Sequence, residues 1–146
     1  MSTRPDDVRR PRLYLDTSAY LTLLVRDPGW ERLADETVGA DLLSSVLLVL
    51  ETKRNLVRLT REGALKQEQY KVCLERVESD ARTFTLRDLT LDLCASNTLP
   101  AIATPRSLDL AHLRTALWFH ASDRIHRFVT MDSSQEQAAK ELGLPV

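Results

Sequence analysis

Cysteine is scarce in this sequence: its 146 residues include only two, Cys73 and Cys94. Their spacing matches no paired zinc-binding pattern, and two cysteines are too few for a disulfide framework. The scarcity therefore argues against a zinc-binding or disulfide-stapled protein. We expect both cysteines to be reduced thiols in the core.

Long apolar runs are also missing. The longest, Val46 to Leu50, is far shorter than the roughly 18 residues that a membrane-spanning helix needs. The first residues, "MSTRPDDVRRPR", are charged and do not resemble a secretion signal. We therefore expect a cytoplasmic protein.

Neither sign of charge dominates, since the formal net charge is -1. A protein that binds nucleic acid only through its overall charge would be basic, so any basic surface here has to be local. The sequence has no internal repeat, no low-complexity segment and no linker rich in glycine or serine. With 43% hydrophobic residues, it predicts one globular domain at residues 12–146, preceded by a flexible arm at residues 1–11.

Strand-like and helix-like patterns alternate along that domain. Tyr70, Cys73, Leu74 and Val77, for example, have the i, i+3, i+4, i+7 spacing of one apolar helical face. The expected strands are "RLYLD", "DLLSS", "TFTL" and "RFVTM". The expected helices are Ser18–Val25, Trp30–Glu36, Val46–Arg61, Gln67–Val77, Asp88–Ser96, Ser107–His120 and "SSQEQAAKELG", the last with Ser133 and Glu136 as a capping box. This alternation predicts an α/β fold in which helices cover both faces of a parallel sheet.

Two of the predicted strands are followed by aspartate. "LYLD" gives Asp16 and "FVTMD" gives Asp132, and ligand chemistry in an open parallel sheet gathers outside the carboxyl ends of the strands. A structural explanation exists for each residue, because an aspartate in this position can simply cap the next helix. The occurrence of the same arrangement twice favours a shared site.

Glu51 lies in the first half of the long predicted helix. Arg54, Asn55 and Arg58 follow it at i+3, i+4 and i+7, so the four side chains share one face. They are either a solvated surface with a weak Glu51–Arg54 pair, or a carboxylate at the mouth of the sheet with arginines placed to bind phosphates.

Asp109 lies two residues after Ser107, which we expect to be the N-cap of the helix in "PRSLDLAHLRTAL". An aspartate in the first turn is stabilised by the helix dipole by roughly 0.3 to 1 kcal/mol, so a structural cause is sufficient for it alone. His112 follows at i+3. An Asp-x-x-His pair is a weak metal signal, and we expect His112 to be packed or hydrogen-bonded rather than catalytic.

Four carboxylates at one sheet edge would repel one another, by about 4 kcal/mol for a pair at ~4 Å with an effective dielectric near 20. A cation has to compensate this repulsion. The donors are hard oxygens, which suit Mg²⁺ or Mn²⁺ rather than Zn²⁺. Such a cation can activate water, hold a phosphate oxygen and stabilise a leaving oxygen, which together describe phosphodiester hydrolysis.

Four segments in this order resemble the PIN-domain family, in particular its VapC-like toxin branch. They are "LYLDTSA", "ETKRNL", "SLDLAHLRTA" and "FVTMD", followed by "AAKELGLPV". The resemblance implies a three-layer α/β/α sandwich and a Mg²⁺- or Mn²⁺-dependent endoribonuclease, the toxin of a type II toxin–antitoxin pair. It also implies a cognate antitoxin that inhibits the enzyme, and a homodimer. The implied acidic cluster, both catalytic and metal-binding, is Asp16, Glu51, Asp109 and Asp132, with Thr130 as a hydroxyl behind it.

Two other interpretations remain open. A PIN-like module that binds RNA or protein without cutting would use the same acids only to cap helices. A phospho-acceptor domain with Asp16 as the phosphorylated residue would need further acids next to it, and "TSAYL" follows instead. The sequence leaves open which RNA is cut, at which base, and whether one metal ion or two take part.

Overall fold

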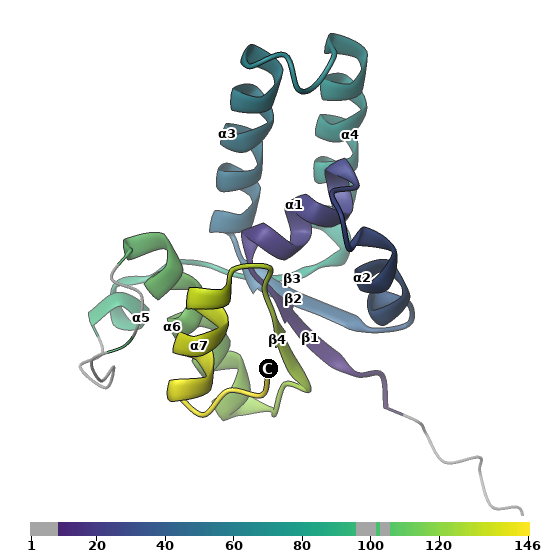
Figure 1. Cartoon of the computed structure of the whole chain (residues 1–146). Helices are drawn as coiled ribbons and strands as arrows, with labels where there is room; N and C mark the ends of the chain where they lie inside the picture. The colour runs from purple at the N-terminus through teal and green to yellow at the C-terminus, as the bar shows by residue number, and fades with distance from the viewer. Residues whose placement is uncertain (1–8, 96–101, 103–105) are drawn as a thin grey trace, which may run out of the picture.

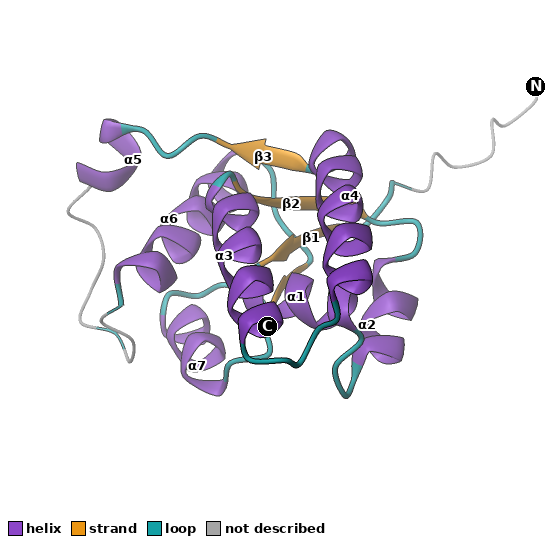
Figure 2. Cartoon of the chain, turned by 90° about the horizontal axis from the view of Figure 1, so that it is seen from above, coloured by secondary structure: helices purple, strands orange, loops and turns teal. Residues whose placement is uncertain are grey.

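The central feature of the fold is a four-stranded parallel sheet in the order β3-β2-β1-β4. The computed structural model describes residues 9–95, 102 and 106–146, and Figures 1 and 2 show its layers. The strands are β1 (Arg12–Leu15), β2 (Asp41–Ser45), β3 (Thr85–Arg87) and β4 (Arg127–Val129). The helices are α1 (Thr17–Val25), α2 (Trp30–Thr37), α3 (Leu47–Arg61), α4 (Gln67–Thr83), α5 (Leu91–Ala95), α6 (Ser107–Ser122) and α7 (Ser133–Glu141).

Successive side chains of β1 point to opposite faces of the sheet, and each face is covered by its own layer of helices. Tyr14 packs with α6 and α7 residues on one face of the sheet, whereas Leu13 and Leu15 pack with Ala19 of α1 and Leu33 of α2 on the other. A further apolar cluster joins α1, α3 and α4, and the latter two form a hairpin that rises from the sheet (Figure 1). The predicted α/β fold with a parallel sheet between two helical layers is therefore confirmed.

The strand order also locates a switch in the connections. The chain steps from β1 to β2 to β3 in one direction and then returns across the sheet to place β4 beside β1. The carboxyl ends of β1 and β4 therefore flank the point where the winding reverses, the usual location of ligand sites in open α/β sheets.

Several predicted boundaries differ from the structure. α4 continues past Val77 to Thr83, because Asp80 accepts hydrogen bonds from Arg76 one turn earlier and from the Tyr20 hydroxyl of α1. β4 ends at Val129 rather than Met131, since the Thr130 hydroxyl turns toward Asp16.

Two predicted helix caps are wrong. Arg106, not Ser107, is the N-cap of α6, although Asp109 still lies in its first turn. The N-cap of α7 is Asp132, whose carboxylate accepts the backbone N–H groups of Ser134 and Gln135. An aspartate one residue earlier thus replaces the predicted capping box.

The two cysteines and the N-terminal arm agree with the sequence predictions only in part. Cys73 is buried, as expected, but Cys94 is exposed, and both thiols are free. Residues 1–8 of the predicted arm lie outside the described residues, while Pro11 accepts a hydrogen bond from Asp41 and Arg9 pairs with Asp123. Of the helices in the described ranges, none is both long and apolar enough to span a membrane.

Candidate active site

Asp16 is the most buried of the predicted acids, with 4% of its surface exposed at the carboxyl end of β1. Its Oδ1 accepts hydrogen bonds from the Ser18 hydroxyl at 2.7 Å and the Ala19 N–H at 3.1 Å. Its Oδ2 accepts from the Thr130 hydroxyl at 2.5 Å. Asp16 therefore caps α1, as the structural explanation predicted, but the hydrogen-bond donors around it are neutral.

Burial dominates the electrostatics of Asp16. Desolvation raises the pKa of its carboxyl group, although the hydrogen bonds from Thr130 and Ser18 act in the opposite direction. An ionised carboxylate in this position is thus destabilised relative to water. A cation beside it would compensate that cost.

Thr130 connects Asp16 to Asp132. Besides donating to Asp16, its hydroxyl oxygen accepts the Asp132 N–H at 3.1 Å. One oxygen of Asp132 caps α7, so capping accounts for this residue as well. The structure therefore joins the two strand-end aspartates of β1 and β4 through the hydroxyl that the sequence analysis had singled out.

Glu51 reaches the same edge from the first turns of α3, with 18% of its side chain exposed. Its Oε1 accepts the Thr17 hydroxyl at 2.8 Å and lies 2.8 Å from Nε2 of His112. Burial alone would raise the pKa of Glu51, but hydrogen bonds from His112 and Thr17, with the charges of His112 and Arg54, outweigh it and lower the pKa. Glu51 is therefore a held, ionised carboxylate and not part of a solvated face.

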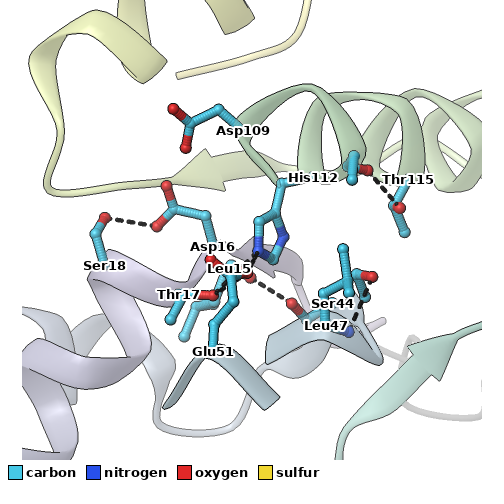
Figure 3. A network of polar contacts seen from close by, with 12 residues as sticks. Leu15, Asp16, Thr17, Ser18, Ser44, Leu47, Glu51, Asp109, His112 and Thr115 are labelled. Atoms are coloured by element: carbon cyan, nitrogen blue, oxygen red, sulfur yellow. Dashed lines mark hydrogen bonds and ion pairs between the residues drawn. The ribbon is translucent and has the colours of Figure 1, made fainter. Parts of the chain in front are cut away.

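Asp109 lies in the first turn of α6, opposite Asp16 in the close-up of the site (Figure 3). Its backbone carbonyl accepts a hydrogen bond from the buried Gln135 side chain at 2.9 Å. Since the Gln135 N–H also binds Asp132, this glutamine ties the start of α6 to the start of α7 and fixes two of the predicted acids relative to each other.

The two arginines predicted to bind phosphates lie on α3 beyond Glu51, and both are exposed. Arg58 pairs with Glu62 at 3.1 Å and contacts Asn55. Arg54 lies closer to Glu51 in the chain and contributes to the lowered pKa of that carboxyl group. Of the two, Arg54 is better placed to meet a ligand at the sheet edge.

Sequence reasoning missed the residues that organise Glu51. Tyr14 and Thr17 lie within the Asp16 motif "LYLDTSA", and the structure turns both toward His112. His112 was expected to be packed or hydrogen-bonded, and it is both, with 2% of its surface exposed. Its spacing from Asp109 was the signal that it faces the same site.

The acids at this edge offer the kind of oxygen atoms that bind a divalent cation, but their side chains are not all arranged to bind one together. The acids supply hard oxygen ligands, and Asp16 is a buried carboxylate with neutral hydrogen-bond donors. However, the described residues contain no group of three or more His, Cys, Asp or Glu side chains arranged to hold a metal ion. Asp132 is directed to the α7 backbone, so its side chain would have to rotate for several carboxylates to bind one cation.

The pH dependence of stability tests the state of Asp16. Because its pKa is raised in the folded chain, the folded state binds more protons than the unfolded state between about pH 4 and the raised pKa, so stability falls as pH rises through that window. We expect metal-free Asp16→Asn, which cannot ionise, to gain stability relative to the unmodified chain over the same window. Urea unfolding of both proteins at several pH values in EDTA measures this, and a pH-independent difference would contradict the raised pKa.

No protein-family model matches the chain, and a search of curated proteins gave no significant match.

Proposed function

We propose that this protein is a divalent-cation-dependent endoribonuclease of the PIN-domain, VapC-like type. The observation that carries the proposal is the buried Asp16 carboxylate, surrounded by neutral donors at the point where the strand connections reverse. Asp109, Asp132 and Glu51 reach the same edge from three other elements. Together with the four sequence segments, this placement favours phosphodiester hydrolysis over other chemistry. We propose that this activity takes place in the cytoplasm, where RNA is present.

Each acid has a role in this proposal. Mg²⁺ or Mn²⁺, when bound, would stabilise phosphate charge and activate water. Asp16 and Asp109 would hold the cation, with oxygens of Glu51 and Asp132 completing the set. Thr130 and Ser18 orient the Asp16 carboxylate through their hydroxyl groups, and the Asp109 backbone is held by Gln135.

The experiment that tests this function is cleavage of a mixed-sequence RNA by the purified chain. We expect fragments in Mg²⁺ or Mn²⁺ and none in EDTA, with single-stranded DNA of the same sequence left intact. Intact RNA under all metal conditions would contradict the proposal.

One observation favours the alternative, a PIN-like module that binds without cutting. Asp16 and Asp132 both cap helices, so structural needs alone account for their carboxylate oxygens. This alternative predicts RNA or protein binding that EDTA does not change. The cleavage assay therefore separates the two functions.

RNA binding should depend more on Arg54 than on Arg58. Arg58 is already paired with Glu62, so its charge is partly compensated, whereas Arg54 lies one turn from Glu51. We expect Arg54→Ala to weaken RNA binding and reduce the slope of log affinity against log salt by about 1, with a smaller change in Arg58→Ala. Arg32→Ala, at an exposed position of α2, is the matched control. Equal salt slopes in all three variants would show that Arg54 and Arg58 do not bind RNA phosphates.

An antitoxin would dock, in our proposal, in the groove between α4 and the α1–α2 pair. The groove has a volume of about 1040 Å³, and Figure 1 shows α4 rising next to the end of α1, with α2 below. Its apolar lining includes Leu23, Leu24, Val25, Trp30, Leu65 and Val72. Its charged lining is mixed and consists of Glu68, Glu75, Asp80, Arg26 and Arg76. An amphipathic helix with charged residues of both signs beside its apolar face fits this combination.

The co-expressed complex should then be inactive. Val72 is 64% exposed in the groove, so Val72→Asp should leave the fold intact and restore cleavage by weakening the complex. Val57→Asp, at an exposed position of α3 outside the groove, should leave inhibition unchanged. A complex that cuts RNA as fast as the free chain would refute inhibition.

Sedimentation of the free chain tests the expected homodimer.

A further inference from the structure

His112 joins three elements behind the candidate active site. It lies on α6, one turn after Asp109, and its ring nitrogens contact β1, α1 and α3 (Figure 3). Nδ1 lies 2.8 Å from the Tyr14 hydroxyl. Nε2 lies 2.8 Å from Oε1 of Glu51 and 3.1 Å from the Thr17 hydroxyl oxygen. The imidazole is thus held from both sides in a nearly solvent-free position.

These contacts show which ring nitrogen of His112 must carry a proton. An ionised carboxylate only accepts hydrogen bonds, and the Thr17 hydroxyl uses its single proton on Oε1 of Glu51, at 2.8 Å. Nε2 therefore faces two acceptors and must carry a proton. Nδ1 faces the Tyr14 hydroxyl at 2.8 Å, which can donate to the neutral ring or accept from the charged one. In either state the surroundings place a proton on Nε2.

The same contacts give the two oxygens of the Glu51 carboxylate different roles. Oε1 accepts both hydrogen bonds, one from Thr17 and one from His112. Within the part of the chain that the structure describes, Oε2 accepts no hydrogen bond. A carboxylate held by one oxygen from two elements keeps its rotamer, and its second oxygen stays available as a ligand.

We propose that His112 is a positioning residue of the active site: its Nε2–H holds Oε1 of Glu51, and the Tyr14 hydroxyl holds the other side of the ring, so that Oε2 is kept for the divalent cation. This inference rests on the proposed function, because it assigns the purpose of the arrangement to cation binding. His112 does not touch the cation or the substrate in this account. Its contribution is to prevent Glu51 from rotating away.

Three variants separate positioning from packing. His112→Phe preserves a ring in the core but removes the donor, and we expect it to weaken Mn²⁺ binding by about 10- to 100-fold, the usual cost of losing a residue that orients a metal ligand. His112→Gln keeps an N–H donor near the position of Nε2 and should therefore bind Mn²⁺ nearly as tightly as the unmodified chain does. His120→Gln is the control on the same helix, since His120 accepts a hydrogen bond from the Ile125 N–H. It should bind Mn²⁺ normally.

Two readouts test the inference. Calorimetric titration of each folded variant with Mn²⁺ gives the affinities, and long-range ¹H–¹⁵N spectra of the metal-free chain report which nitrogen of His112 carries the proton. A proton on Nε2, in the neutral or the charged ring, together with the expected order of affinities supports the inference. A protonated Nδ1 with bare Nε2 would overturn it even if His112→Phe fails to fold, and so would His112→Phe binding Mn²⁺ as tightly as the unmodified chain. If the unmodified chain binds no Mn²⁺, the proposed function fails instead.

Discussion

Asp16→Asn should abolish RNA cleavage while leaving the chain at least as stable as before. The amide has almost the shape of the carboxylate, so it can still accept from Ser18 and the Ala19 N–H, and the Thr130 hydroxyl can rotate to accept from it. What is lost is the negative charge, whose burial is unfavourable. We expect cleavage to fall by more than the roughly 10- to 100-fold that losing an outer partner of a metal ligand costs.

The matched control for this substitution is Asp35→Asn. Asp35 is an exposed aspartate on α2, so it loses the same charge in water and away from the site. Thermal unfolding and single-turnover cleavage should be measured for both variants in millimolar Mg²⁺. Full activity of Asp16→Asn would remove Asp16 from the site, and a large loss of activity in Asp35→Asn would mean that overall charge matters instead.

Asp109→Asn should have an effect as large as that of Asp16→Asn, and Asp132→Asn a smaller one. The Asp109 side chain faces Asp16 across the site (Figure 3), whereas Asp132 already uses one oxygen to cap α7. Asparagine is as good a helix cap as aspartate, so Asp132→Asn tests the charge without removing the cap. Both variants should retain cooperative unfolding.

Asp132→Ala distinguishes the two roles of this residue. It removes the cap as well as the charge and should cost about 1 kcal/mol of stability that Asp132→Asn retains. If cleavage is normal in Asp132→Asn but stability falls in Asp132→Ala, Asp132 is a cap and not a metal ligand. Normal cleavage by Asp109→Asn would be a more serious contradiction, since Asp109 and Asp16 are the two acids assigned to hold the cation.

The fold was predictable because its signals are local. The alternation in β1 sends Tyr14 to one layer and Leu13 to the other, and the periodicity of α4 already shows in its first turns. The end of α4 was not predictable, because it depends on the bond from Tyr20 to Asp80, which are 60 residues apart. Likewise, the N-cap of α7 was not predictable, because Asp132 and Ser133 could each cap the helix and only backbone geometry decides between them.

The positions of the candidate site residues in the fold were more predictable than the orientation of their side chains. The strand ends and helix starts identify Asp16, Asp109 and Asp132, since topology brings those points to one edge. The orientation of Glu51 could not be predicted, because its partner His112 is 61 residues away and buried under another helix. For the same reason, sequence alone treated Glu51 as a member of an arginine-bearing face, although its carboxylate points into the protein.

A cation-dependent nuclease is tested most directly by RNA cleavage measured before and after metal removal, with the unmodified chain and Asp16→Asn side by side. We expect that EDTA stops cleavage by the unmodified chain, that excess Mg²⁺ or Mn²⁺ restores it, and that Asp16→Asn stays inactive under both conditions. Cleavage that persists in EDTA, or that Asp16→Asn carries out at the same rate, would contradict a cation-dependent nuclease built around Asp16.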